Sequence, residues 1–130
     1  MITEKDYCDY ETCIALKELG YNGTPEECSH FGAFYMNGEE IFYDRLYNSE
    51  LKENECLRVP LYLAQKWLRE EKKVIIVIVP YTYNIITETN TWTYEIWLED
   101  NLEREVHDFN TYEEALSEGI KEAVKILKEK

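Results

Sequence analysis

Apolar and polar residues follow two different patterns in the second half of the chain. Six consecutive β-branched apolar residues, 74–79, do not alternate with polar ones, which predicts a strand covered on both faces, as in the centre of a sheet. The segment TWTYEIWLED does alternate and predicts a strand with one buried face. Asp100 and Asn101 then predict a turn, and LEREVHDF predicts a third strand. For residues 81–91 the sequence allows either a long hairpin loop or continued strand.

Two helices are predicted on either side of these strands. Pro60 suits the start of a helix over 60–71, because its missing N–H needs no partner in the first helical turn. Thr111 and Glu114 have the spacing of a capping box ahead of a C-terminal helix. The apolar face predicted for this helix consists of Leu116, Ile120, Ala123 and Leu127.

The first half of the chain predicts a helix and a hairpin. Thr3 and Asp6 have capping-box spacing, and Gly20 ends a helix over 4–19. The predicted buried face of this helix consists of Cys8, Thr12, Ala15, Leu16 and Leu19.

Asn37 and Gly38 form the typical centre of a type I′ turn between two short β-rich segments. A two-residue loop would place Met36 opposite Glu39 and Phe34 opposite Ile41. The polar residues 45–56 that follow predict irregular structure.

The predicted fold class is therefore α+β, with the order α-β-β-α-β-β-β-α and an antiparallel sheet packed against helices. A length of 130 residues suits a single domain over 1–130. We expect it to contain a helix and hairpin over 1–58, followed by a helix, a three-stranded meander and a C-terminal helix over 59–130.

The charge balance narrows the classes of partner. The chain has 27 acidic and 14 basic residues, a formal net charge of −13. This charge disfavours direct binding to nucleic acid, which requires Lys and Arg to neutralise phosphates, and to anionic membranes. It favours solubility, basic protein partners or cations. The N-terminal residues lack the features of a signal peptide, and the longest apolar run has six residues, so we expect a cytoplasmic location.

Candidate chemistry is sparse, and neither a catalytic motif nor a cofactor-binding motif is found, which favours a non-enzymatic role. Cys8, Cys13, Cys28 and His30 supply the residue types of a zinc site. On a helix over 4–19, however, Cys8 and Cys13 would lie about 140° apart around the axis, which disfavours joint ligation. We therefore expect reduced thiols and no metal. A catalytic Cys–His pair would need one of the four thiols near His30 or His107, and the sequence does not place the thiols relative to either histidine.

Four acidic pairs and the tyrosines have simple structural interpretations. The acidic pairs lie in predicted loops, turns and a helix start, where solvent exposure is the common arrangement. They are Glu26–Glu27, Glu39–Glu40, Glu99–Asp100 and Glu113–Glu114. The 11 tyrosines suit protein contacts because the side chain is rigid and amphipathic, but they also suit half-buried sheet positions.

The candidate interface centres on Trp97. In the alternating strand it shares the polar face with Glu95, so it is either an interface residue or covered by another part of the same chain. Tyr81 and Tyr83, which follow the apolar run, complete the predicted interface.

Four stretches resemble one group of proteins: CDYETCIALKELGY, LYLAQKWLREEK, TWTYEIWLED and TYEEALSEGIKEAVKILK. They are similar to segments of an uncharacterised family of short acidic proteins from gut Bacteroides-type bacteria and their phages and prophages. The resemblance implies an accessory or mobile-element gene. It carries over no activity and no functional residue.

Three functions agree with these patterns. The first is a non-enzymatic protein-interaction module that binds a protein partner or itself. The second is a DNA mimic that inhibits a nucleic-acid-binding host protein, which requires carboxylates spaced like duplex phosphates. The third is an enzyme with an unrecognised carboxylate or Cys–His site, which requires a pocket with a perturbed acid.

Overall fold

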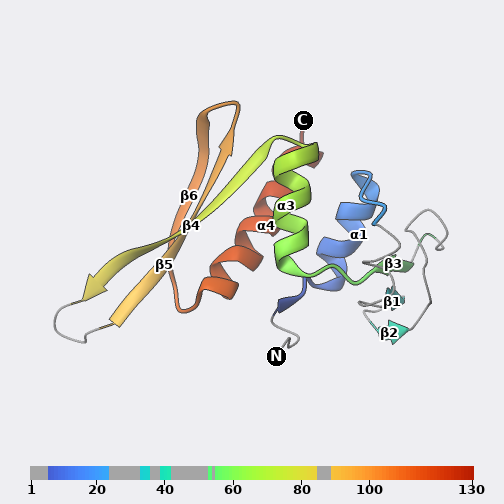
Figure 1. Cartoon of the computed structure of the whole chain (residues 1–130), viewed down its shortest axis with the longest axis horizontal. Helices are drawn as coiled ribbons and strands as arrows, with labels where there is room; N and C mark the ends of the chain where they lie inside the picture. Colours follow the sequence, from blue (N-terminus) through green and yellow to red (C-terminus); the bar gives the residue numbers. More distant parts are fainter. Residues whose placement is uncertain (1–5, 24–32, 36–38, 42–52, 54, 85–88) are drawn as a thin grey trace. The chain divides into compact units, whose positions relative to one another are not determined.

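The computed structural model of the chain describes residues 6–23, 33–35, 39–41, 53, 55–84 and 89–130. For 33–35, 39–41, 81–84, 89 and 90 it describes the backbone alone. The fold class is α+β, as predicted: helices pack against antiparallel sheet (Figure 1). The described residues fall into two compact units, one over 7–60 and one over 61–130, to which Asp6 also belongs.

In the unit over 7–60, helix α1 (Tyr10–Glu18) begins later than the predicted residue 4. Asp9 is the N-cap, and its carboxylate accepts a hydrogen bond from the Thr12 N–H at 2.8 Å. Cys8 is extended rather than helical, because its N–H donates to the Val59 carbonyl at 2.8 Å. The Cys8–Val59 backbone bond and the Asp9 cap therefore take the place of the predicted capping box at Asp6. Thr3 lies outside the described residues.

This unit also contains a three-stranded antiparallel sheet in the order β2-β1-β3, formed by β1 (Ala33–Tyr35), β2 (Glu39–Ile41) and β3 (Glu55–Leu57).

The predicted hairpin is confirmed as the β1–β2 pair, but its predicted register is wrong. Phe34 lies opposite Glu40, and it is Ala33 that lies opposite Ile41. Because Tyr35 pairs with Glu39, residues 36–38 connect the strands instead of Asn37 and Gly38 alone. Met36 and the turn itself lie outside the described residues.

Strand β3 contradicts the prediction of irregular structure up to residue 56. All three of its residues are buried, and it pairs with β1 and packs against α1. The Lys17 ammonium of α1 donates to the Glu55 carbonyl at 2.6 Å. A three-residue strand has too little local pattern to detect, and its stability comes from these distant partners.

In the unit over 61–130, both predicted helices are confirmed. Helix α3 (Leu61–Glu71) begins directly after Pro60. Helix α4 (Tyr112–Lys128) begins after the N-cap Thr111, whose hydroxyl accepts from the Glu114 N–H at 3.0 Å. The buried side of α4 includes three of the four predicted apolar residues, and Leu127 is half-buried.

Three strands form the sheet of this unit: β4 (Val74–Asn84), β5 (Thr89–Leu98) and β6 (Asn101–Phe109). They are antiparallel in the order β4-β5-β6. Strand therefore continues through most of 81–91, with 85–88 outside the described residues. The prediction that 74–79 is a central strand is wrong, because β4 lies at the edge of this sheet. Its unbroken apolar run shows that both faces are apolar, not that both faces are covered.

Helices α3 and α4 cover one face of the sheet (Figure 1). The alternation in β5 is confirmed, since Tyr94 and Ile96 are buried on this face. A Cβ atom on Gly119 of α4 would lie 3.1 Å from the Ile76 Cγ2 atom and 3.2 Å from the Tyr94 Cβ, so the helix backbone packs closely on β4 and β5.

The β5–β6 connection is a tight turn. Glu99 and Asp100 have φ angles of 49° and 68°, and Leu98 pairs with Asn101. Two central residues with positive φ are typical of a type I′ turn. The predicted turn at Asp100 and Asn101 was thus one residue late.

Strand β6 carries two register shifts against β5, one opposite Trp92–Tyr94 and one opposite Ile96–Trp97. Each shift is a bulge that inserts one extra residue in β6 relative to β5. In the bulge opposite Trp92–Tyr94, Asp108 has a φ of 75°. Within the described ranges, no helix is long and apolar enough to cross a membrane.

Candidate functional site: the face of the β4–β6 sheet opposite α3 and α4

The second face of the β4–β6 sheet lies opposite α3 and α4. Residues directly opposite each other on antiparallel strands point to the same side, so the pairing register identifies the side chains on this face. We call it the open face, and the register assigns to it Ile75, Val77, Val79, Thr93, Glu95, Trp97, Leu102 and Glu105. His107 joins them through its contact with Thr93.

An apolar row crosses one end of the open face. Ile75, Trp97 and Leu102 are neighbours on β4, β5 and β6. Ile75 is 46% exposed and Leu102 is 44% exposed, which places them among the most exposed large apolar side chains of the described residues. Three adjacent apolar side chains on three strands form a contiguous surface instead of an isolated exposed residue.

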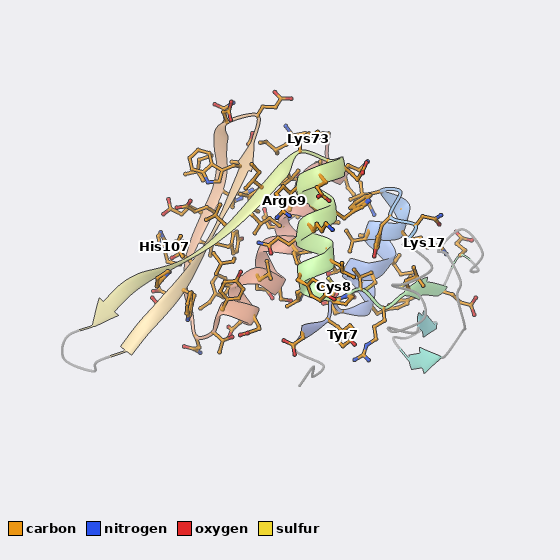
Figure 2. The ribbon with its side chains drawn as sticks, in the orientation of Figure 1. Tyr7, Cys8, Lys17, Arg69, Lys73 and His107 are labelled. Atoms are coloured by element: carbon orange, nitrogen blue, oxygen red, sulfur yellow. The ribbon has the colours of Figure 1, made fainter. Side chains whose placement is uncertain are left out.

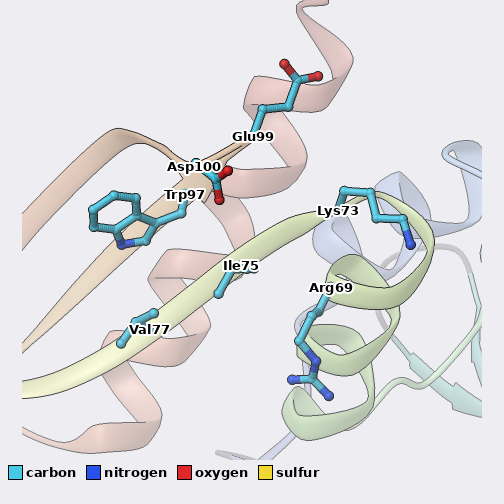
Figure 3. Close-up of a pocket in the computed structure, with 7 residues that line it drawn as sticks. All are labelled: Arg69, Lys73, Ile75, Val77, Trp97, Glu99 and Asp100. Carbon is cyan, nitrogen blue, oxygen red and sulfur yellow. The ribbon is translucent and has the colours of Figure 1, made fainter.

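A pocket of about 430 Å³ lies along this row at the β4 edge (Figure 3). Its apolar wall is formed by Ile75, Val77 and Trp97. The charged lining residues are Arg69, Lys73, Glu99 and Asp100, from α3, the turn after it and the β5–β6 turn. The pocket therefore has an apolar centre with charges of both signs at its rim.

The next row of the open face is acidic. Val77, Glu95 and Glu105 are neighbours across the three strands, which places the two carboxylates side by side. Glu95 Oε1 accepts a hydrogen bond from the Trp97 indole Nε1 at 3.1 Å. This bond connects the acidic row to the apolar row.

The third row contains His107, which is labelled in Figure 2. Its Nδ1 lies 2.8 Å from the Thr93 hydroxyl, and its Nε2 lies 3.3 Å from Glu105 Oε1. The order hydroxyl–imidazole–carboxylate is also that of a nucleophilic triad. The Thr93 side chain is fully buried, however, so in this conformation no substrate can reach its hydroxyl.

The structure brings two of the four predicted interface residues together, Trp97 and Glu95. Tyr81 and Tyr83 belong to β4, but their side chains lie outside what is described. The sequence analysis missed Ile75, because the apolar run was assigned to the sheet interior. It also missed Leu102, whose place opposite Trp97 depends on the position of the β5–β6 turn, and Glu105, whose place opposite Glu95 depends on a bulge in β6.

The cysteines form a separate, buried group in the unit over 7–60. Cys8, Cys13 and Cys56 are free thiols with at most 2% exposure, and Cys13 Sγ lies 3.6 Å from the Cys8 carbonyl oxygen. The helical argument against joint ligation was wrong in its premise, because Cys8 precedes α1. Cys28 and His30 lie outside the described residues, and no group of three ligands arranged to hold a metal occurs in the part of the chain that is described.

His107 belongs to the unit over 61–130, and this segment contains no cysteine. Of the acidic pairs, Glu99–Asp100 and Glu113–Glu114 are exposed, in agreement with their interpretation as solvated residues. The side chains of the other two pairs lie outside the description.

Comparison with protein families, with curated proteins and with solved structures found no match to this chain. Its function is therefore inferred from the geometry of its own residues.

Proposed function

We propose that this chain is a non-enzymatic protein-interaction module that binds its partner through the open face. The observation that carries the proposal is the exposed apolar row, in which Ile75 and Leu102 are nearly half exposed on either side of Trp97. Exposed apolar surface of this kind is costly in water and is removed from water when a partner binds.

Trp97 is well suited to the centre of such an interface. Tryptophan is enriched among the residues that contribute most to binding between proteins, especially where neighbouring side chains exclude water. Ile75 and Leu102 occupy these neighbouring positions. The bond between Trp97 Nε1 and Glu95 also fixes the indole before any partner arrives, which lowers the entropy lost on binding.

The partner contacts the face and not the free edge of β4. The Gln65 side chain of α3 donates to the Ile76 carbonyl at 2.9 Å, so this edge acceptor is already used. Pro80 has no N–H to offer to an added strand. Both features are typical of edge strands that avoid further pairing.

Affinity capture of the tagged full chain from a lysate of its own host tests the proposal. The double variant Ile75→Thr/Leu102→Thr removes the exposed apolar ends of the row while keeping residues with high strand propensity. The control Tyr62→Gln removes an apolar side chain that is 56% exposed on α3. Circular dichroism verifies that all variants are folded.

We expect at least one protein that the wild type and the Tyr62→Gln control retain equally and that the double variant retains about tenfold less. The purified partner must show the same dependence in direct binding. If no protein is captured, or if every captured protein is insensitive to the double substitution, the proposal is wrong.

A further inference from the structure

Glu95 and Glu105 are direct cross-strand neighbours on the open face. Side chains in this relation have Cβ atoms about 5 Å apart, and two like charges there repel each other. This repulsion lowers the stability of the folded monomer, which suggests that the two carboxylates serve in binding.

Among the described residues, the contacts of the two carboxylates compensate for this repulsion only in part. Glu95 accepts from a neutral indole N–H, and Glu105 contacts His107 at 3.3 Å. The arginine of β6, Arg104, lies opposite Ile96 on the helix side of the sheet, where its guanidinium pairs with Glu122 at 3.0 Å. The basic residues that line the pocket, Arg69 and Lys73, lie at the β4 edge.

The charges near the open face are therefore divided by position. The β5–β6 half carries Glu95 and Glu105, and the turn at its end carries Glu99 and Asp100. Basic side chains lie at the β4 edge. A partner that covers the apolar row must also lie over the neighbouring acidic row, because Trp97 and Glu95 are joined by a hydrogen bond.

We infer that the partner is a protein segment that combines apolar and basic residues and places one Lys or Arg side chain between Glu95 and Glu105. This inference rests on the proposed function and names the chemistry of its partner. The cation would relieve the repulsion between the carboxylates, while the apolar residues of the segment cover Ile75 and Leu102. A second copy of this chain fits less well, because a two-fold contact through this face would bring two further carboxylates to the same surface.

A short peptide that alternates leucine and lysine, labelled with a fluorophore, is the probe, and its counterpart of leucine and glutamate is the reference. Fluorescence anisotropy measures their binding to the full chain. Glu105→Gln and Glu95→Gln each remove one charge from the pair. Glu118→Gln removes one charge from the solvent side of α4, across the sheet from the open face, and is the matched control.

We expect the lysine peptide to bind and the glutamate peptide not to bind. Glu105→Gln and Glu95→Gln should each weaken binding about tenfold, and Glu118→Gln by less than about twofold, because only the first two remove a direct partner of the cation. Unfolding midpoints should show that Glu105→Gln is as stable as the wild type or more stable, so a loss of binding cannot be attributed to unfolding.

Equal effects of Glu105→Gln and Glu118→Gln, or no binding of the lysine peptide, would overturn the inference. A dimer in sedimentation equilibrium that Glu105→Gln strengthens would assign the face to a second copy instead. If Ile75→Thr/Leu102→Thr weakens peptide binding and Glu105→Gln does not, the proposed function holds and only the basic chemistry of the partner is wrong.

Discussion

Gly119 of α4 lies directly against Tyr94 of β5. A Cβ atom built on Gly119 would lie 3.2 Å from the Tyr94 Cβ and 3.3 Å from its Cγ, and 3.1 Å from Ile76 Cγ2. The missing side chain thus allows the helix backbone to approach the covered face of the sheet. The opposite face of the same strand carries Trp97 and Glu95, so this contact supports the strand that presents the candidate site.

Gly119→Ala should lower the free energy of unfolding by about 1 kcal/mol. Alanine gains about 1 kcal/mol of helix propensity, but overpacking a close contact costs about 1–3 kcal/mol. The Tyr94 Cβ cannot rotate away, because it is attached to the strand backbone. Urea unfolding measures the change. Ser117→Ala in the same helix is the control, because it gains helix propensity without this contact. A Gly119→Ala variant that is more stable than the wild type would show that the helix can shift.

The three described thiols should react slowly in the native protein. Burial is the main cause that raises the pKa of Cys13, and Cys8 raises it further, while the hydrogen bond with Cys56 acts in the opposite direction. The hydrogen bond with Cys13 and burial raise the pKa of Cys56. The thiolate is the reactive form, so both effects suppress labelling. In a Cys28→Ser background, labelling with an aromatic disulfide reagent should be at least about a hundredfold slower than in the urea-unfolded chain, because it requires local opening. One rapidly labelled thiol under native conditions would contradict the buried arrangement.

Tyr94 should make the chain less stable at alkaline pH. Burial is the main cause that raises its pKa above the ordinary value of 10.0, and the carboxylates of Glu122 and Glu118 raise it further, while Arg104 acts in the opposite direction. The unfolded chain therefore loses the Tyr94 proton first. The stabilisation is complete below about pH 10 and is lost as pH rises from there through the folded-state pKa.

The comparison of wild type with Tyr94→Phe isolates this effect, because all other titrating groups are common to both. The difference in the free energy of unfolding between the two proteins should be constant below about pH 10 and should shift in favour of Tyr94→Phe above it. Tyr62→Phe, at an exposed site on α3, controls for the loss of one phenol. A difference that stays constant to higher pH would show that Tyr94 ionises equally in both states.

Features that depend on neighbours a few positions apart were predictable from the sequence. Thr111 and Glu114 marked the start of α4, Pro60 marked the start of α3, and the alternation around Tyr94 identified the buried face of β5. These signals are local because a cap bonds within its own first turn, and because the two faces of a strand are set by its period of two.

Which faces of the sheet remain exposed depends on how segments far apart in the sequence pair and pack. The apolar run of β4 is compatible with a central strand or with an edge strand that has one apolar face exposed, and the choice depends on which segments pair beside it. The short strand β3 and the start of α1 were likewise set by distant partners, Ala33 and Val59 among them. The position of Glu105 beside Glu95 depends on a bulge in β6, and the residues that surround a bulge do not reveal the register across it. The candidate site therefore arises from pairing between strands, which the order of residues along one strand does not specify.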